Sequence, residues 1–372
     1  MDAVIYIIGP DRGSTRFQRR YYLTLCNCFI VREDGIRNPT VKKEKYMKYR
    51  EFGKTGIQIS ELVFGGGAVG GLLINQDDET KRKAIRRAMD AGINWIDTAP
   101  SYGQGKSEES LGWLLKEIDN DPFISTKVAI DTRNLEDISG QIEKSIEESL
   151  TRLKRDSVTL LQLHNQIGAE TKGRMIATSE VLRKNGVLDH LQRMKDQGLT
   201  KHVGITALGE TPGIMEVIER GRIASAQVYY NLLNSSAGMK LPPTWEAYDF
   251  SGILDACEES GVAAMGIRVF SAGVIATDER TGRERPLMIG DTVESETAKA
   301  MAVFNEIGTD YGTHAQTAIR FALAQKKLSC VIFGLAELDH LELAISAQNL
   351  GLLPPEGLEK LKTIYKKGFP IS

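Results

Sequence analysis

The feature that most restricts the fold is an alternation of short apolar runs with segments of helical periodicity, continuing from about residue 62 to about residue 350. Runs such as LVFGGG, NWIDTA, FISTKVA and VTLLQLH have the length and composition of buried strands. Between two of them, GQIEKSIEESLTRL places Ile142, Ile146, Leu150 and Leu153 on one helical face. Eight strand-like runs lie between LVFGGG and SCVIFG. The alternation predicts parallel strands joined by helices, and at this length it favours a closed barrel weakly over a doubly wound sheet.

Three segments stand outside the eightfold alternation. REFGKTGIQIS predicts a hairpin that turns at residues 54–56, a charged loop covers about residues 277–295, and PEGLEKLKTIYKKG predicts a final helix. Residues 1–46 show no sustained period and mix Gly, Pro and charge. We therefore predict a poorly ordered extension over 1–46, and over 47–372 an α/β domain with an N-terminal hairpin and an extra C-terminal helix.

Composition narrows the class of protein. The 372 residues are 41% hydrophobic and 26% charged, with a formal net charge of −2, which gives no electrostatic reason to expect nucleic acid or an anionic membrane as a partner. The four cysteines are too sparse for a disulfide scaffold and form no metal-ligand cluster with histidine. The longest early apolar stretch, of about eleven residues, is too short to span a bilayer. We expect a cytoplasmic protein with reduced thiols and no bound metal.

Four polar residues stand at or just after the ends of three apolar runs: Asp97 and Tyr102 in INWIDTAPSYG, Lys127 in FISTKVA and His164 in LLQLHN. The carboxyl ends of parallel strands meet at one edge, so these side chains are expected in one pocket. Taken singly, each residue is more often structural than catalytic. Their joint position at strand ends favours a shared catalytic role.

The order and spacing of these residues, with the flanking WIDTAPSYG and the later AQVYYNLLN, resemble the aldo-keto reductase family over about residues 49–350. Within that family, VGITAL is similar to the branch of galactose and threo-aldose dehydrogenases. The resemblance implies a (β/α)8 TIM barrel whose bottom is closed by the hairpin. Since MKYREFGKTG begins as family members begin, we expect Met47 to be the native start and residues 1–46 to be an upstream translation or an extension.

The resemblance also implies the chemistry. Tyr102 is expected to donate a proton to a carbonyl oxygen while hydride reaches the carbon, or to act in reverse during alcohol oxidation. A free phenol has a pKa of about 10, and the ammonium of Lys127 is expected to lower it. Asp97 would hold Lys127 charged, and His164 would place the substrate oxygen.

No GxGxxG fingerprint follows the first strand, which disfavours a Rossmann dehydrogenase. The resemblance instead implies nicotinamide cofactor binding by a set spread along the chain: Gly65, Asp97, Thr206, Gln227, Phe270, Ser271, Gly273, Gly334 and Glu337. Gln227 would bind the carboxamide, and an aliphatic residue, Ile267, stands where the family has an aromatic ring. Arg268 beside it matches no family position.

Cofactor preference is predicted from Glu337, which stands where members specific for NADP carry a basic residue. A carboxylate repels a 2′-phosphate and can accept hydrogen bonds from a free ribose, so NAD(H) is predicted to be preferred and NADP(H) to be possible. The alternative is that Glu337 points to solvent while Lys326 or Arg320 meets the phosphate.

The leading functional hypothesis is an NAD(P)-dependent oxidoreductase acting on a carbonyl or alcohol substrate, such as an aldose or another small sugar-like compound. The alternatives are a general aldehyde reductase and a cofactor-binding regulatory subunit that resembles potassium-channel beta subunits. A barrel hydrolase would need a second carboxylate near Asp97, and the sequence offers none. The substrate, the reaction direction and the oligomeric state are left open.

Overall fold

The computed structural model describes residues 47–369, except 68, 241, 243–244, 246–247, 278, 281 and 288–289. The predicted extension over residues 1–46 lies outside the described residues. The expectation that Met47 is the native start therefore stays a prediction.

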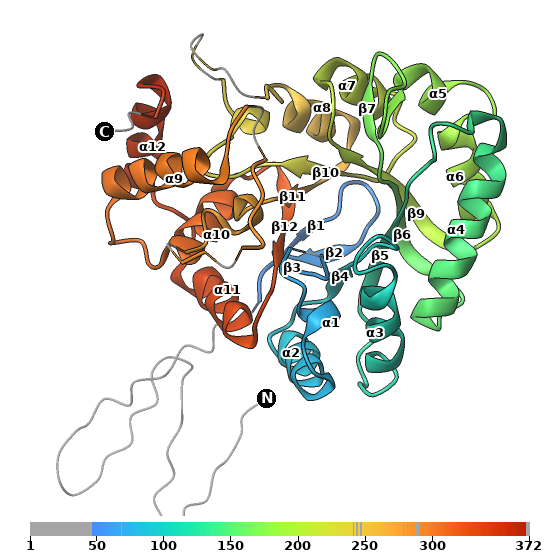
Figure 1. The fold of residues 1–372 in the computed structure, drawn as a ribbon, viewed down its shortest axis with the longest axis horizontal. Helices are drawn as coiled ribbons and strands as arrows, with labels where there is room; N and C mark the ends of the chain where they lie inside the picture. Colours follow the sequence, from blue (N-terminus) through green and yellow to red (C-terminus); the bar gives the residue numbers. More distant parts are fainter. Residues whose placement is uncertain are drawn as a thin grey trace, which may run out of the picture. The chain divides into compact units, whose positions relative to one another are not determined.

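A closed barrel of eight parallel strands forms the centre of the fold (Figure 1). The strands are β3 (Leu62–Gly65), β4 (Trp95–Asp97), β5 (Phe123–Val128), β6 (Val158–Leu163), β9 (Thr200–Ala207), β10 (Ser225–Tyr229), β11 (Ala263–Ile267) and β12 (Leu328–Gly334). The first strand pairs with the last, with Val63 opposite Ile332, and this pairing closes the barrel. The predicted eight-stranded barrel is confirmed.

Helices surround the barrel, and most of them follow the predicted alternation (Figure 1). They are α1 (Leu72–Asn75), α2 (Asp78–Asp90), α3 (Lys106–Leu114), α4 (Ile138–Leu153), α5 (Thr178–Leu182), α6 (Val187–Asp196), α7 (Thr211–Glu219), α8 (Ile253–Ser260), α9 (Val293–Ile307), α10 (His314–Ala324), α11 (Leu338–Leu350) and α12 (Pro355–Lys366). The four stripe residues predicted for α4 are all buried. Short 3-10 turns are η1 (Leu135–Asp137), η2 (Ser236–Gly238) and η3 (Ser271–Gly273).

Two helices, α9 and α10, precede β12, because the chain turns between Gly308 and Gly312. Both glycines have positive φ, at 83° and 101°, a conformation that L-residues rarely adopt. Capping boxes at Thr292 and Thr313 satisfy backbone N–H groups at the starts of α9 and α10.

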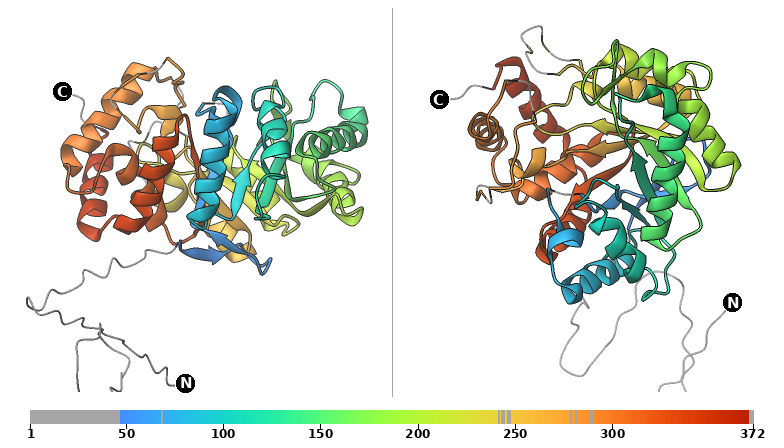
Figure 2. Two further views of the ribbon diagram at one scale, coloured as in Figure 1. Left: turned by 90° about the horizontal axis from the view of Figure 1, so that it is seen from below. Right: turned by 45° about the vertical axis from the view of Figure 1, so that its right-hand side comes forward.

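The predicted hairpin consists of β1 (Tyr49–Glu51) and β2 (Gln58–Ser60), paired antiparallel. It lies across the end of the barrel where the strands begin, as the view from below shows (Figure 2). Phe52 inserts its ring against Trp95 inside the barrel, with 4.7 Å between the ring centroids. The lower half of the barrel interior is thus filled with apolar side chains, and a site can form only at the other end.

One feature of the chain after β6 was not predicted. Two short strands, β7 (Gln166–Gly168) and β8 (Met175–Ala177), pair in parallel between β6 and α5. An isolated bridge from Ile167 to Gly209 ties this pair to the end of β9. Within the described part of the chain, no helix is both long and apolar enough to cross a bilayer.

Candidate active site

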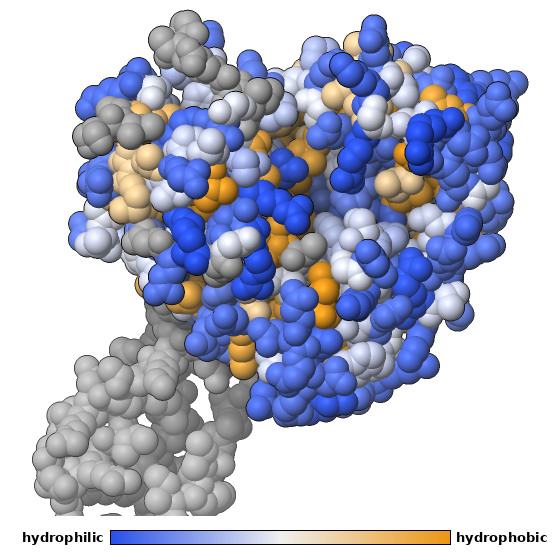
Figure 3. Space-filling view, in the orientation of Figure 1, coloured by the Kyte–Doolittle hydropathy of each residue, from blue (hydrophilic) through white to orange (hydrophobic). Residues whose placement is uncertain are grey.

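The four predicted catalytic residues meet at the end of the barrel where the strands finish. Asp97 ends β4, Lys127 is the fifth residue of β5, and His164 follows β6 directly. Tyr102 lies in the turn that leads from β4 into α3. This face of the molecule is hollowed near its centre, with hydrophobic surface along part of the rim (Figure 3).

Asp97 and Lys127 form a buried ion pair at the base of the cluster. The Lys127 ammonium lies 2.7 Å from Asp97 Oδ2 and donates to the carbonyl of Thr98 at 2.8 Å. Asp97 Oδ1 accepts from Ser125 Oγ at 2.7 Å and from Gln227 Nε2 at 2.8 Å. Burial is the largest single effect and lowers the pKa of Lys127, but Asp97 and Tyr102 together outweigh it and raise that pKa. Lys127 is therefore a permanent cation at the site.

Tyr102 lies above this cation. Lys127 Nζ is 4.7 Å from the centroid of its ring, and the ring of His164 meets it edge-on at 6.1 Å. Burial raises the pKa of the Tyr102 phenol, and the charge of Lys127 offsets only part of that rise. Lys127 thus lowers this pKa, as expected, but burial raises it by more, so the net pKa of the phenol lies above its ordinary value. The phenol stays protonated at neutral pH, the form that a proton donor requires.

His164 is held in its neutral form. Burial, followed by the positive charges of Lys127, Arg174 and Arg268, lowers the pKa of its imidazole to about 3. An uncharged imidazole offers one nitrogen as a donor and the other as an acceptor. It can therefore orient a substrate oxygen without adding a charge.

The predicted cofactor residues are spread along the chain, yet their elements form one arc of the barrel. Neighbouring strands run in the order β9, β10, β11, β12 and β3, next to the β4–β5–β6 arc that carries the acid, the ammonium and the imidazole. On or just after the strands of the cofactor arc lie Gly65, Thr206, Gln227, Phe270, Ser271, Gly273, Gly334 and Glu337. Asp97 adjoins this set through its hydrogen bond with Gln227.

The glycines of this arc leave room for a ligand. A Cβ on Gly65 would come within 2.5 Å of the Phe333 carbonyl, so only glycine fits where β3 approaches β12. Gly334 is exposed with open space at its Cβ position. Gly65 is therefore required by the close approach of β3 to β12, whereas Gly334 leaves the exposed end of β12 open to a ligand.

Some side chains of the arc are already engaged by the protein. Ser271 Oγ donates to the buried Glu296 at 3.0 Å, and Thr206 Oγ1 donates to the carbonyl of Leu163 at 3.2 Å. Arg320 donates to the carbonyls of Tyr311, Gly351 and Leu352, and Lys326 precedes β12 at the opposite end of the barrel. The two alternatives for a 2′-phosphate contact are thus placed elsewhere, whereas Glu337 is exposed at the start of α11.

Sequence reasoning missed three members of the site. Ser125 bridges Trp95 Nε1 and Asp97 from two residues before Lys127, on the same face of β5. Tyr229 lies two residues after Gln227 and therefore faces the same interior. Arg268 was noticed without a role, and its guanidinium lies 5.4 Å from the centroid of the Tyr229 ring. The period of two along a strand could have indicated Ser125 and Tyr229, but no pattern predicts where Arg268 points.

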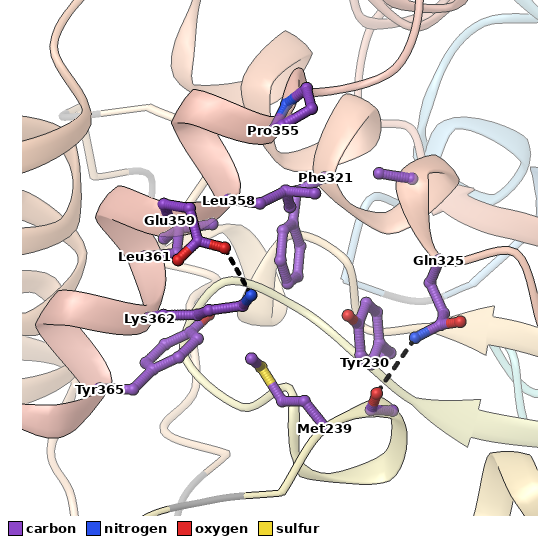
Figure 4. A pocket seen from close by; sticks show the side chains of 12 residues that line it. Tyr230, Met239, Phe321, Gln325, Pro355, Leu358, Glu359, Leu361, Lys362 and Tyr365 are labelled. Carbon is purple, nitrogen blue, oxygen red and sulfur yellow. Dashed lines mark hydrogen bonds and ion pairs between the residues drawn. The ribbon is translucent and has the colours of Figure 1, made fainter.

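A separate pocket of about 260 Å³ lies outside the catalytic cluster, between α10, α12 and η2 (Figure 4). Tyr230 and Phe321 stack on one side of it with 5.1 Å between ring centroids, and Glu359 pairs with Lys362 at α12. Trp245 packs against Tyr365 of α12, with 6.1 Å between the ring centroids. Among the described residues, no group of three or more His, Cys, Asp or Glu side chains could hold a metal ion.

Comparison with known proteins matches this chain to one protein family. Residues 61–366 match the model of the aldo/keto reductase family. L-galactose dehydrogenase of Arabidopsis thaliana is 25% identical over 344 residues, covering 86% of this chain and 95% of that protein. D-threo-aldose 1-dehydrogenase of a Pseudomonas species is 27% identical over 257 residues, covering 61% and 71%. A probable voltage-gated potassium channel subunit beta of rice is 25% identical, covering 86% and 97%.

Solved structures agree on the fold. The holo form of aldo-keto reductase AKR11C1 from Bacillus halodurans superposes with a TM-score of 0.65 at 22% identity, covering 86% of this chain and 97% of that one. The glycerol dehydrogenase AKR11B4 from Gluconobacter oxydans has the same TM-score at 20% identity, covering 87% and 98%. At these identities the likeness concerns the barrel architecture.

Proposed function

The chain belongs to the aldo/keto reductase family, and on that premise we propose that it transfers hydride between a nicotinamide cofactor and the carbonyl or alcohol group of a small sugar-like substrate. The observation that carries the proposal is the Tyr102–Lys127–Asp97–His164 cluster at the open end of the barrel. The two sugar dehydrogenases among the relatives support an aldose as the substrate class.

The proposed mechanism assigns one task to each side chain. The cofactor, when bound, supplies or accepts the hydride. Tyr102 holds the proton that passes to the substrate oxygen, and His164 orients that oxygen as a neutral hydrogen-bonding partner. Lys127, kept charged by Asp97, stabilises the negative charge that grows on Tyr102 as its proton leaves.

Gln227 links the two halves of the site in this proposal. Its amide nitrogen donates to Asp97, which leaves its amide oxygen to accept from a carboxamide N–H. Glu337 at the head of α11 supports a preference for NAD(H), because its carboxylate repels the 2′-phosphate of NADP(H) and accepts from ribose hydroxyls.

The test is a panel of aldoses, lactols and simple aldehydes, followed at 340 nm with NADH, NADPH and their oxidised forms. We expect turnover of at least one sugar, a higher kcat/KM with the NAD pair, and loss of at least about 100-fold in kcat for Tyr102→Phe. Cofactor affinity, measured by quenching of protein fluorescence, should be nearly unchanged in that variant.

Tyr49→Phe is the matched control, because its hydroxyl donates to the Gly92 carbonyl far from the catalytic cluster. Wild-type kcat in Tyr102→Phe would show that Tyr102 is not the proton donor. Inactivity of the wild-type protein across the panel, with cofactor still bound tightly, would favour the regulatory function of the channel-subunit relatives.

A further inference from the structure

Arg268 occupies an unusual backbone conformation at the end of β11. Its φ is 59°, and Ser271 and Ala272 in the same turn also have positive φ, at 42° and 53°. Non-glycine residues adopt this region only when their surroundings hold them there. The Arg268 carbonyl accepts from Asn231 Nδ2 at 2.9 Å and from the Ser271 amide at 2.8 Å. These two bonds fix the backbone in the turn from which the side chain reaches the ring of Tyr229.

The guanidinium of Arg268 is half-buried, yet no carboxylate of the described residues lies within ion-pair distance of it. None of its N–H groups makes a hydrogen bond within that part of the chain; its one close contact is the ring of Tyr229 at 5.4 Å. The carboxylate whose charge acts on it, Glu296, already accepts from Ser271 Oγ and the Leu287 amide. A partly desolvated cation with five donors is thus left for another partner.

The charges around the cluster indicate whether the group that Arg268 binds is positive or negative. The pKa of the His164 imidazole is lowered by Lys127, Arg174 and Arg268 together, after burial, so all three cations act on the same point. Asp97 and Lys127 neutralise each other in their ion pair, which leaves Arg174 and Arg268 as the net positive charges that act on His164. The potential at the substrate position is therefore positive, which attracts an anion.

We propose that Arg268 binds an anionic group of the substrate, a carboxylate or a phosphate, so that the preferred substrate is an acidic hydroxyaldehyde or the corresponding alcohol rather than a neutral aldose. This inference rests on the proposed function and deepens it by naming the substrate class. The planar fork of a guanidinium binds carboxylate and phosphate through two parallel hydrogen bonds. The Arg268 guanidinium lies over the ring of Tyr229, and its charge acts on both Tyr102 and His164.

The first experiment measures binding without turnover. The full-length protein loaded with NADH, which cannot oxidise an alcohol, is titrated with glycerate, 3-phosphoglycerate and glycerol in a calorimeter. We expect at least one anion to bind more tightly than glycerol, Arg268→Gln to weaken that anion by about 10- to 100-fold, and Arg268→Lys to recover part of the affinity. Arg220→Gln, which removes an exposed ion pair on α7, should leave the affinity unchanged.

The second experiment compares kcat/KM for glyceraldehyde and glyceraldehyde 3-phosphate, and for glucose and glucuronate. Arg268→Gln should lower the value for the charged member of a pair at least 10-fold more than for the neutral member. Equal losses on both members, or a loss in NADH affinity of the same size, would assign Arg268 to the cofactor pyrophosphate and overturn the proposal. Anion affinity that is no higher than glycerol affinity in the wild type would also overturn it.

The two experiments separate this inference from the function on which it rests. Arg268-dependent anion binding without turnover of any aldehyde would support the anion site while contradicting the oxidoreductase. Turnover of neutral sugars that is insensitive to Arg268→Gln would support the oxidoreductase while contradicting the anion site.

Discussion

At the residue scale, the site depends on which side chains burial leaves charged. The ammonium of Lys127 is fully buried but keeps its charge because it has an ionised partner at 2.7 Å and a carbonyl at 2.8 Å. The imidazole of His164 lies among cations and loses its charge. Burial thus accompanies a cation at the end of β5 and a neutral ring at the end of the neighbouring strand β6, and the sign of the neighbouring charge decides between them.

The His164 shift predicts a dependence of stability on pH. The folded-state pKa of about 3 lies below the unfolded value of about 6.5, so the unfolded chain takes up the proton first as the pH falls. Folding stability should decline below about pH 6.5, by at most about 1.4 kcal/mol per pH unit and by less where solvent screens the half-buried ring.

Urea unfolding of the wild type and of His164→Asn between pH 5 and pH 8 measures this effect. The stability difference between the two proteins should change across this range, with the wild type losing more on the acid side. A stability difference between the two proteins that stays the same from pH 5 to pH 8 would contradict the lowered pKa of the His164 imidazole.

At the scale of elements, helix α3 packs closely against helix α4. Gly112 of α3 lies against the backbone of Arg152 near the end of α4, and a Cβ there would collide with the Arg152 carbonyl. Glu108, one turn earlier, pairs with Arg152 at 2.7 Å and accepts from Thr126 of β5. Helix α3, which follows the Tyr102 turn, is therefore held to both its neighbouring helix and the barrel.

Gly112→Ala tests this contact, because the higher helix propensity of alanine opposes the steric cost of its Cβ. Alanine gains about 1 kcal/mol of helix propensity over glycine, whereas overpacking a rigid contact costs about 1–3 kcal/mol. Because the obstructing atom is backbone, we expect a net loss of about 1–2 kcal/mol in the free energy of unfolding, measured in urea.

Gly357→Ala in α12 is the matched control. There the nearest atom is a side-chain atom of Leu353 at 3.0 Å, which can move aside. A smaller loss, or a gain, is expected. If the Gly112 variant were the more stable of the two, the close contact between α3 and α4 would be wrong.

At the scale of the whole molecule, the two ends of the barrel have different tasks. The proposed catalytic cluster lies where the strands finish, and the hairpin closes the end where they begin (Figure 2). Arg50 of β1 joins the first segment of the barrel to the last, because its guanidinium donates to the carbonyls of Leu323, Gln325 and Leu328 and pairs with Glu61 at 2.8 Å. Stability and catalysis can therefore be altered independently.

Arg50→Met should lower the stability of the protein without lowering its kcat. It leaves the buried carboxylate of Glu61 without its ion-pair partner and three carbonyls without their donor, so the free energy of unfolding should fall by about 3–5 kcal/mol. The kcat of the protein that remains folded at 25 °C should stay within about 2-fold of wild type, because the catalytic cluster lies at the opposite end of the barrel. Urea unfolding and steady-state kinetics on one preparation measure both. A fall in kcat that matches the loss of stability would show that the ends are coupled.

The sequence alone determined the elements and the four residues at the centre of the candidate site. Strand and helix periods are local, so apolar runs and stripes such as that of α4 predicted the alternating strands and helices, the hairpin and the last helix, while the family resemblance implied the closed barrel. The sequence also predicted that four polar residues share one site, because parallel strands carry their carboxyl ends to one edge. These residues are Asp97, Tyr102, Lys127 and His164.

Only the tertiary structure decided what depends on contacts between distant segments. The hydrogen bond from Gln227 to Asp97 joins residues 130 positions apart, and the net rise in the Tyr102 pKa depends on burial that no local pattern records. The partly buried guanidinium of Arg268, with its strained backbone and its place over Tyr229, likewise exists only once β10 and β11 pair. Periodicity determines which residues share one face of a helix or strand. The burial of a side chain and its pKa depend on neighbours from distant segments, which surround it only after the chain has folded.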